Sequence, residues 1–174
     1  MAHYETTGKE IIEQLHTKPI GAFVSGVGTG GTLMGVGRRL KKQNSETLIV
    51  AMEPDTMPLL SKNIKICALE PEKMPIISGG KIMGQHKIEG IGDDFVPELY
   101  DKKLIDDVFL INDEDAINMS RKLSKELGLG VGISSGANLI GAIKLEERIK
   151  KEVVIVFPDD NKKYLSTDLA QNMS

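Results

Sequence analysis

Several residue types are scarce in this chain of 174 residues, and each scarcity excludes a class of function. Tryptophan is absent and aromatic residues make up only 4% of the chain, so stacking platforms for nucleic-acid bases are not expected. Positive charge is not in excess, because the formal net charge is −3, and no basic stripe for nucleic acid is present. The one cysteine, Cys67, has no partner for an internal disulfide, which is typical of a reducing compartment.

Long hydrophobic runs are missing as well. No apolar stretch reaches the length that spans a bilayer, and nothing resembles a signal peptide. The sequence therefore predicts a cytoplasmic protein with neither membrane nor nucleic acid among its partners. Hydrophobic residues at 40% and charged residues at 27% are ordinary for a globular protein. We expect one domain over residues 1–169, followed by a short tail at 170–174.

Apolar segments alternate with helical patterns along most of the chain. Strands are expected at residues 20–24, 48–52, 108–111 and 153–157, and helices at residues 7–15, 32–43, 113–127 and 135–149. Thr7 and Glu10 have the spacing of a capping box, Asn112 or Asp113 is expected to cap the third helix, and Ser135 the fourth. This alternation predicts an α/β fold with a mostly parallel sheet and helices on both faces.

Glycine, in contrast, is concentrated at one place. The stretch SGVGTGGTLMGVG, residues 25–37, holds six glycines directly after the first expected strand. Backbone N–H groups in such a loop, followed by a helix N-terminus, form a cradle for phosphate. Gly26, Gly28 and Gly31 also fit the dinucleotide pattern G-x-G-x-x-G, with Glu53 placed to bind a ribose. Spacing alone leaves NAD(P), another phosphate cofactor and a merely structural turn open.

Five motifs in register narrow this choice. They are HYETTG at 3–8, GTGGT at 28–32, SGGKIMGQHKIEGIGDDFVP at 78–97, GISSGA at 132–137 and YLST at 164–167. Together they resemble the cysteine synthase (O-acetylserine sulfhydrylase) family of pyridoxal-phosphate enzymes, in the family's order and over nearly the whole chain. The resemblance implies a tryptophan-synthase-β-like fold, fold type II of the pyridoxal-phosphate enzymes, and pyridoxal 5′-phosphate as cofactor.

The resemblance also assigns roles to individual residues. It implies that the cofactor's phosphate is held by Gly28, Thr29, Gly30, Gly31 and Thr32. Ser134 matches the residue that binds the pyridine nitrogen, and Gly90 lies in the loop beside substrate and cofactor. Asp159 follows the last expected strand, and we interpret it as a solvated loop carboxylate. No metal site is expected, because His3 and His16 have no partners at ligand spacing.

Two motifs of the family do not occur in this sequence. One carries the lysine that forms the Schiff base with the cofactor, within a Ser-Val-Lys-like stretch. The other is the Thr-Ser-Gly-Asn loop that binds the substrate carboxylate. We therefore expect no catalytic residue in this chain, which looks like the C-terminal half of such an enzyme and is expected to be inactive alone.

The reaction that the resemblance implies is β-replacement of O-acetylserine with sulfide to give cysteine. Glu89 replaces the usual glutamine, and EGIGDDFVP is similar to the corresponding segment of cystathionine β-synthase, so that activity and cysteine desulfuration stay open. An NAD(P)-binding domain and a non-catalytic fragment or interaction module stay open too. The implied partners are a small amino-acid substrate, a second copy in a homodimer and, as in some relatives, serine acetyltransferase.

Overall fold

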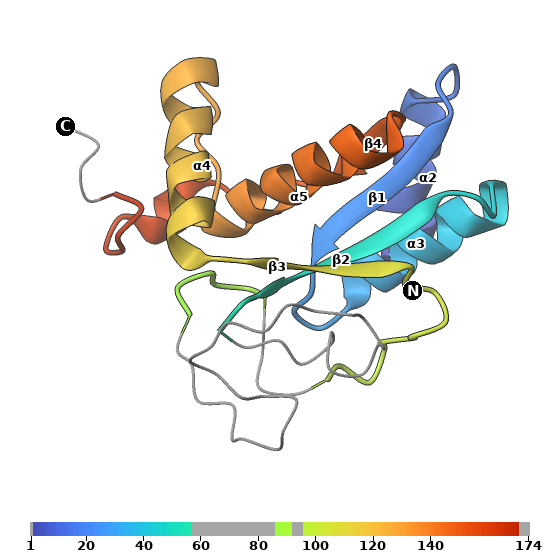
Figure 1. The fold of residues 1–174 in the computed structure, drawn as a ribbon, viewed down its shortest axis with the longest axis horizontal. Coiled ribbons are helices and arrows are strands. Elements are labelled where there is room, and N and C mark those ends of the chain that lie inside the picture. The colour runs from blue at the N-terminus through green and yellow to red at the C-terminus, as the bar shows by residue number, and fades with distance from the viewer. Residues whose placement is uncertain (1, 57–85, 92–95, 171–174) are drawn as a thin grey trace.

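A four-stranded parallel sheet forms the centre of the structure (Figure 1). The computed structural model describes residues 2–56, 86–91 and 96–170, so Cys67 lies outside the described residues, as does the tail beyond Ala170. The strands are β1 (Ile20–Gly26), β2 (Leu48–Pro54), β3 (Asp107–Ile111) and β4 (Glu152–Ile155), in the order β3-β2-β1-β4. The predicted parallel α/β fold is confirmed.

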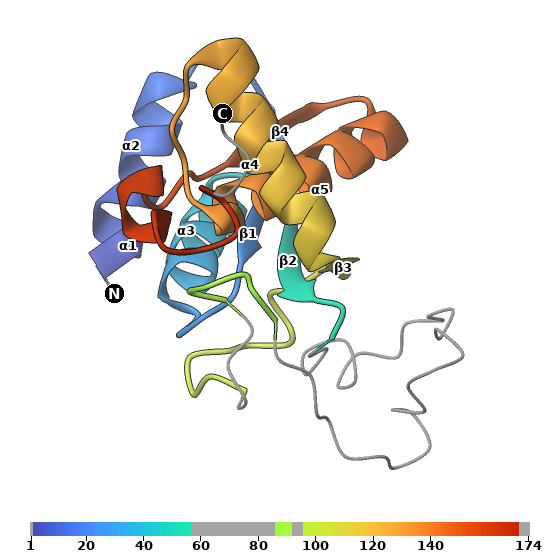
Figure 2. The ribbon, with the colours of Figure 1, turned by 90° about the vertical axis from the view of Figure 1, so that its left-hand side faces the viewer.

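Helices cover both faces of this sheet. They are α1 (Ala2–Glu5), α2 (Thr7–Gln14), α3 (Gly31–Gln43), α4 (Asp113–Leu127) and α5 (Ile133–Ile149), followed by a 3₁₀ helix at Asn161–Tyr164. Figure 2 shows α1, α2 and α3 on one side of the strands and α4 and α5 on the other. No described helix is both long and apolar enough to cross a bilayer.

Alternating side chains of the strands fill two separate cores. On the α3 side, Phe23 and Ile49 pack with Leu33 and Leu40 of that helix, all 1% exposed or less. On the opposite side, Val24, Val50 and Met52 pack with α4 and α5. A strand buried on both faces reads as a continuous apolar run, which is why residues 20–24 and 48–52 are recognisable from sequence.

Helix ends test the capping predictions one by one. Asn112 caps α4 as expected, because its Oδ1 accepts the N–H of Glu114 at 2.8 Å. The capping box at Thr7 is wrong: Thr7 lies inside α2, and its hydroxyl contacts His3 Nδ1 at 3.0 Å instead.

The cap expected at Ser135 is also wrong. Helix α5 begins at Ile133, with Gly132 as its N-cap and no capping side chain. Ser135 is therefore inside the first turn and fully buried. Its neighbour Ser134 also belongs to this first turn and not to the preceding loop, so the backbone of the helix fixes its position.

The order of the strands creates a crevice at one end of the sheet. From β1 the chain passes through α3 to β2 on one side, whereas β4, which follows α5, pairs with β1 on the other side. The segments that leave the carboxyl ends of β1 and β4 therefore diverge. Ligands of open α/β sheets bind at such a switch point.

Candidate active site

A cavity of about 210 Å³ lies at the carboxyl ends of β1 and β4. Its described lining includes all seven residues singled out from the sequence: Gly28, Thr29, Gly30, Gly31, Thr32, Gly90 and Ser134. These residues come from the loop after β1 with the start of α3, from the segment 86–91 and from the first turn of α5. The fold thus brings three distant stretches of sequence to one place.

The glycine loop turns sharply into α3. Gly30 is the N-cap of this helix and has φ 81°, a left-handed conformation that glycine adopts without strain. The carbonyl of Gly30 accepts the N–H of Met34 at 2.9 Å, whereas the N–H groups of the first turn have no partner within the helix. These donors, together with the dipole of the 13-residue helix, form a site that favours an anion.

Ser134 also lines the cavity, and the backbone next to it is held by hydrogen bonds. The side chain is 3% exposed. Gly132, two residues earlier, donates its N–H to the carbonyl of Asp159 at 3.1 Å and accepts the hydroxyl of Ser120 at 2.9 Å. The start of α5 is therefore tied both to α4 and to the segment after β4, so the Ser134 hydroxyl has a defined position.

Asp159 is a cavity residue that the sequence interpretation missed. Its carboxylate is not solvated: the side chain is 14% exposed, and Oδ2 accepts the hydroxyl of Tyr164 at 2.7 Å. Burial, followed by this hydrogen bond, raises the pKa of Tyr164 above its ordinary value. Lys163 Nζ lies 3.7 Å from the same oxygen and also lines the cavity. No local sequence signal distinguishes Asp159 from its exposed neighbour Asp160.

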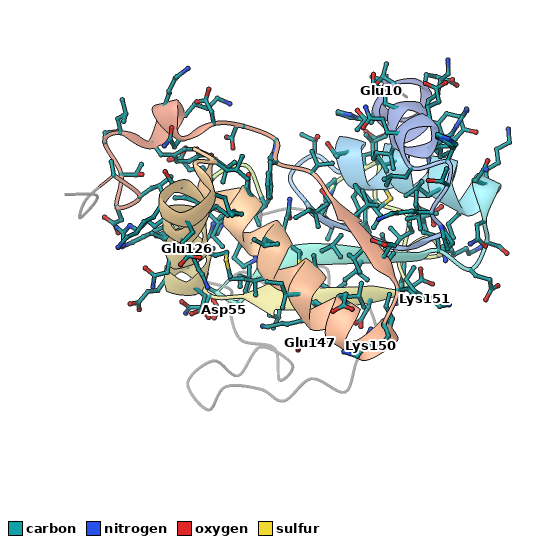
Figure 3. The ribbon with its side chains drawn as sticks, turned by 90° about the horizontal axis from the view of Figure 1, so that it is seen from above. Glu10, Asp55, Glu126, Glu147, Lys150 and Lys151 are labelled. Atoms are coloured by element: carbon teal, nitrogen blue, oxygen red, sulfur yellow. The ribbon has the colours of Figure 1, made fainter. Side chains whose placement is uncertain are left out.

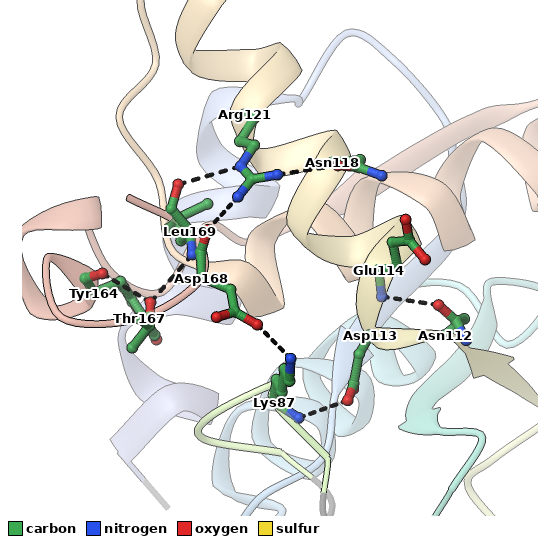
Figure 4. Close-up of polar contacts among 10 residues, drawn as sticks. All are labelled: Lys87, Asn112, Asp113, Glu114, Asn118, Arg121, Tyr164, Thr167, Asp168 and Leu169. Carbon is green, nitrogen blue, oxygen red and sulfur yellow. Dashed lines mark hydrogen bonds and ion pairs between the residues drawn. The ribbon is translucent and has the colours of Figure 1, made fainter. Parts of the chain in front are cut away.

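The segment that carries Gly90 is anchored by polar contacts shown in Figure 4. The backbone N–H of Lys87 donates to Asp113 Oδ2 at 2.8 Å, and its ammonium group pairs with Asp168, which raises the pKa of Lys87. Arg121 of α4 donates to the carbonyls of Asp168 and Leu169. The segment 86–91 is thus linked to α4 and to the C-terminal part of the described chain.

One other sequence-based possibility loses its support here. Glu53, the acid expected to bind a ribose, is 2% exposed within β2 and is not among the described residues that line the cavity. Of the residues that the structure describes, no three His, Cys, Asp or Glu side chains come together in a way that could hold a metal ion.

Comparison with known proteins agrees with this geometry. Residues 1–159 match the family described as "Pyridoxal-phosphate dependent enzyme". Cysteine synthase of Staphylococcus aureus is 40% identical over 169 residues, which cover 96% of this chain and 49% of the relative.

Two solved structures have a similar fold. A hydrogen sulfide-producing enzyme of Fusobacterium nucleatum has a TM-score of 0.81 and 44% identity over 99% of this chain and 48% of its own. An O-acetylserine-dependent cystathionine β-synthase of Helicobacter pylori has a TM-score of 0.79 and 35% identity over 97% and 49%. The chain spans about half the length of these relatives. With the family match covering most of its residues, this chain belongs to the pyridoxal-phosphate-dependent enzymes.

Proposed function

We propose that this chain forms the cofactor-binding part of a cysteine-synthase-type enzyme, which replaces the acetoxy group of O-acetylserine with sulfide. The observation that carries the proposal is the cavity itself, because the glycine loop and the buried residue Ser134 line it together at the carboxyl ends of β1 and β4. Pyridoxal phosphate, when bound, supplies a ring that withdraws electrons from the substrate's Cα. The remaining chemistry depends on how the protein holds that ring.

The phosphate end fits the glycine loop. N–H groups between Gly28 and Thr32, with the hydroxyls of Thr29 and Thr32, would hold the dianion. The α3 dipole contributes up to about 2 kcal/mol in a partly buried geometry. Lys163 is the one lysine or arginine of the described chain that lines the cavity, and its ammonium group pairs with Asp159 at 3.7 Å, so we assign recognition of the phosphate to the backbone donors.

The ring end fits Ser134. Its neutral hydroxyl would hydrogen-bond the pyridine nitrogen without forcing protonation, as a carboxylate would. An unprotonated ring withdraws electrons less strongly, which suits departure of a group from Cβ better than reactions that need a long-lived carbanion at Cα. Ser134 therefore favours β-replacement.

The proposal also specifies the sulfur substrate, which we take to be sulfide. Sulfide is favoured because the GISSG form of the motif is that of cysteine synthases, and the Staphylococcus aureus relative carries that name. One observation favours a cystathionine β-synthase-like alternative: Glu89, which replaces the usual glutamine, lines the cavity. The Helicobacter pylori structure with that activity is among the similar folds.

The partners follow from the resemblance, and the location follows from the lone cysteine and the lack of long apolar runs. We include in the proposal an amino-acid substrate, a homodimer and a location in the cytoplasm, with serine acetyltransferase as a candidate partner. The division into a domain at 1–169 and a tail at 170–174 also stays a prediction. Size-exclusion chromatography with light scattering tests the homodimer directly.

The phosphate assignment is tested by Gly30→Asp. A carboxylate at this position would repel the phosphate, and the φ of 81° would be strained for aspartate. We expect the affinity of the 174-residue chain for pyridoxal phosphate, measured by equilibrium titration, to fall by at least about tenfold, equivalent to 1.4 kcal/mol.

Gly128→Asp is the matched control. Gly128 also has a left-handed backbone (φ 68°), but it ends α4 and is not part of the cavity lining. The same strain and charge there should leave the affinity unchanged. An equal loss of affinity in both variants, or binding of NAD(P) in place of pyridoxal phosphate by the unmodified chain, would refute the assignment.

A further inference from the structure

Asn138 lies at the point where β1 and β4 separate. The pairing of these strands ends at Val24 and Ile155, whereas β1 continues to pair with β2 as far as Gly26 and Met52. Beyond Val24, the edge of β1 that faces β4 has lost its partner strand. The amide of Asn138, 2% exposed, occupies this position.

Both ends of the amide are used. Oδ1 accepts the N–H of Gly26 at 2.7 Å, and Nδ2 donates to the carbonyl of Val156 at 2.9 Å. The side chain thus links the two strands by hydrogen bonds at the point where the backbones of β1 and β4 no longer pair directly. The N–H of Val27, the first residue after β1, binds the carbonyl of Met52 on the other side at 3.2 Å.

The position of Asn138 connects the two halves of the cavity. It lies four residues after Ser134, so both side chains project from the same face of α5. Gly26, which it holds, begins the glycine-rich stretch, and Gly26, Asn138 and Val156 all line the cavity. Ile91 packs so closely on Gly26 that a Cβ there would overlap its Cγ2, so the segment bearing Gly90 depends on the same contact.

We propose that Asn138 is a positioning residue: its amide keeps the ends of β1 and β4 apart and fixes the glycine loop relative to Ser134. The choice of pyridoxal phosphate as the ligand rests on the proposed function. The hydrogen bonds of Asn138 to Gly26 and Val156 do not depend on that function. The amide of asparagine donates and accepts from one planar group, whereas an ionised aspartate lacks the donor and leucine lacks both donor and acceptor. Two buried backbone groups would lose their partners without it.

Asn138→Leu in the 174-residue chain tests the proposal, because leucine keeps the volume and adds no charge. We expect hydrogen exchange of the Gly26 amide to accelerate while that of Val27 stays slow, and the affinity for pyridoxal phosphate to fall by about tenfold. Asn138→Gln, which keeps the amide but lengthens the side chain, should fold and show the same changes to a smaller degree.

Thr47→Val is the matched control. Thr47 is also 2% exposed, and its hydroxyl donates to the carbonyl of Ile20 at 3.0 Å, at the opposite end of β1. This variant loses a buried hydrogen bond of the same strand, so it should lower stability without changing affinity. Equal losses of affinity in Thr47→Val and Asn138→Leu, or unchanged Gly26 exchange in both Asn138 variants, would overturn the proposal.

The two readouts separate this proposal from the proposed function. If the unmodified chain binds neither pyridoxal phosphate nor inorganic phosphate, the ligand assignment fails, and with it the effect of Asn138 on binding. Exchange at Gly26 then still decides whether Asn138 holds the end of β1.

Discussion

Gly132 shows how a single residue without a side chain determines the position of a functional one. Its backbone is extended (φ −73°, ψ 170°), so any residue could adopt the conformation. The space is the constraint: a Cβ would overlap Asp159 Oδ1 and lie 2.7 Å from Tyr164 Cε2. Glycine is required here because the segment after β4 packs directly on the turn that precedes Ser134.

We predict that Gly132→Ala destabilises the fold by about 1–3 kcal/mol, the range of overpacked cores. It should also displace Ser134 and weaken binding of pyridoxal phosphate. Urea unfolding measures the first effect and equilibrium titration the second.

A double-mutant cycle separates steric overlap from other causes. Asp159→Gly removes the closest overlap and leaves the contact with Tyr164 Cε2, so in its background Gly132→Ala should cost less than it does alone. Purely additive effects on the free energy of unfolding would show that Gly132 is not constrained by Asp159.

At the scale of elements, the end of α5 carries local strain. Lys150 is the C-cap of this helix, with φ 52°, and is the one non-glycine residue of the described chain with positive φ. Figure 3 shows it beside Glu147 and Lys151, at the turn into β4 and away from the carboxyl ends of the strands. Glycine is the preferred residue at such helix ends.

We predict that Lys150→Gly stabilises the chain by about 0.5–1 kcal/mol. Removing left-handed strain gains about 1–2 kcal/mol, and the greater freedom of glycine in the unfolded state offsets part of it. The midpoint of urea unfolding should rise, with no change in affinity for pyridoxal phosphate.

Two further variants test the cause of this gain. Lys150→Ala removes the ammonium but keeps the strain, so it should not stabilise. Gly128→Ala introduces strain at the end of α4, where no atom lies within 4 Å of the new Cβ, and should destabilise by about 1 kcal/mol. A gain in Lys150→Ala as large as in Lys150→Gly would point to charge instead.

The elements also show what a sequence does and does not reveal. The cap at Asn112 was predictable, because its partner N–H groups are two and three residues away. Ser135 was mistaken for a cap because a shift of two residues in the start of a helix leaves no trace in the pattern. Asn138 carries no local signal at all, since Gly26 is 112 residues away in sequence. Motifs in the sequence indicate the glycine loop and Ser134, whereas the contact between Asp159 and Tyr164 is visible only in the fold.

In the molecule as a whole, the residues proposed to bind the cofactor are present, whereas the motifs that carry out the reaction do not occur in the sequence. The described chain holds the glycine loop and Ser134, which we propose bind the phosphate and the ring nitrogen, and the cavity residue Asp159, which accepts the hydroxyl of Tyr164. The lysine and carboxylate-binding motifs of the family do not occur among its 174 residues. Lys163 is the one lysine of the described chain that lines the cavity, and it is paired with Asp159 on the side of Ser134. It is therefore not expected to replace the missing lysine.

We predict that the 174-residue chain alone forms no measurable cysteine from O-acetylserine and sulfide. Without the lysine and the carboxylate loop, substrate is neither activated nor positioned, and positioning alone contributes about 7–11 kcal/mol to catalysis. Joining the chain to the N-terminal half of the Staphylococcus aureus relative should restore turnover, and Lys163→Gln in the joined protein should not abolish it. Cysteine production is measured with protein of verified mass. Turnover by the 174 residues alone near the enzyme median of about 10 s⁻¹ would show that the chain contains a catalytic lysine after all, and its loss in Lys163→Gln would identify that lysine.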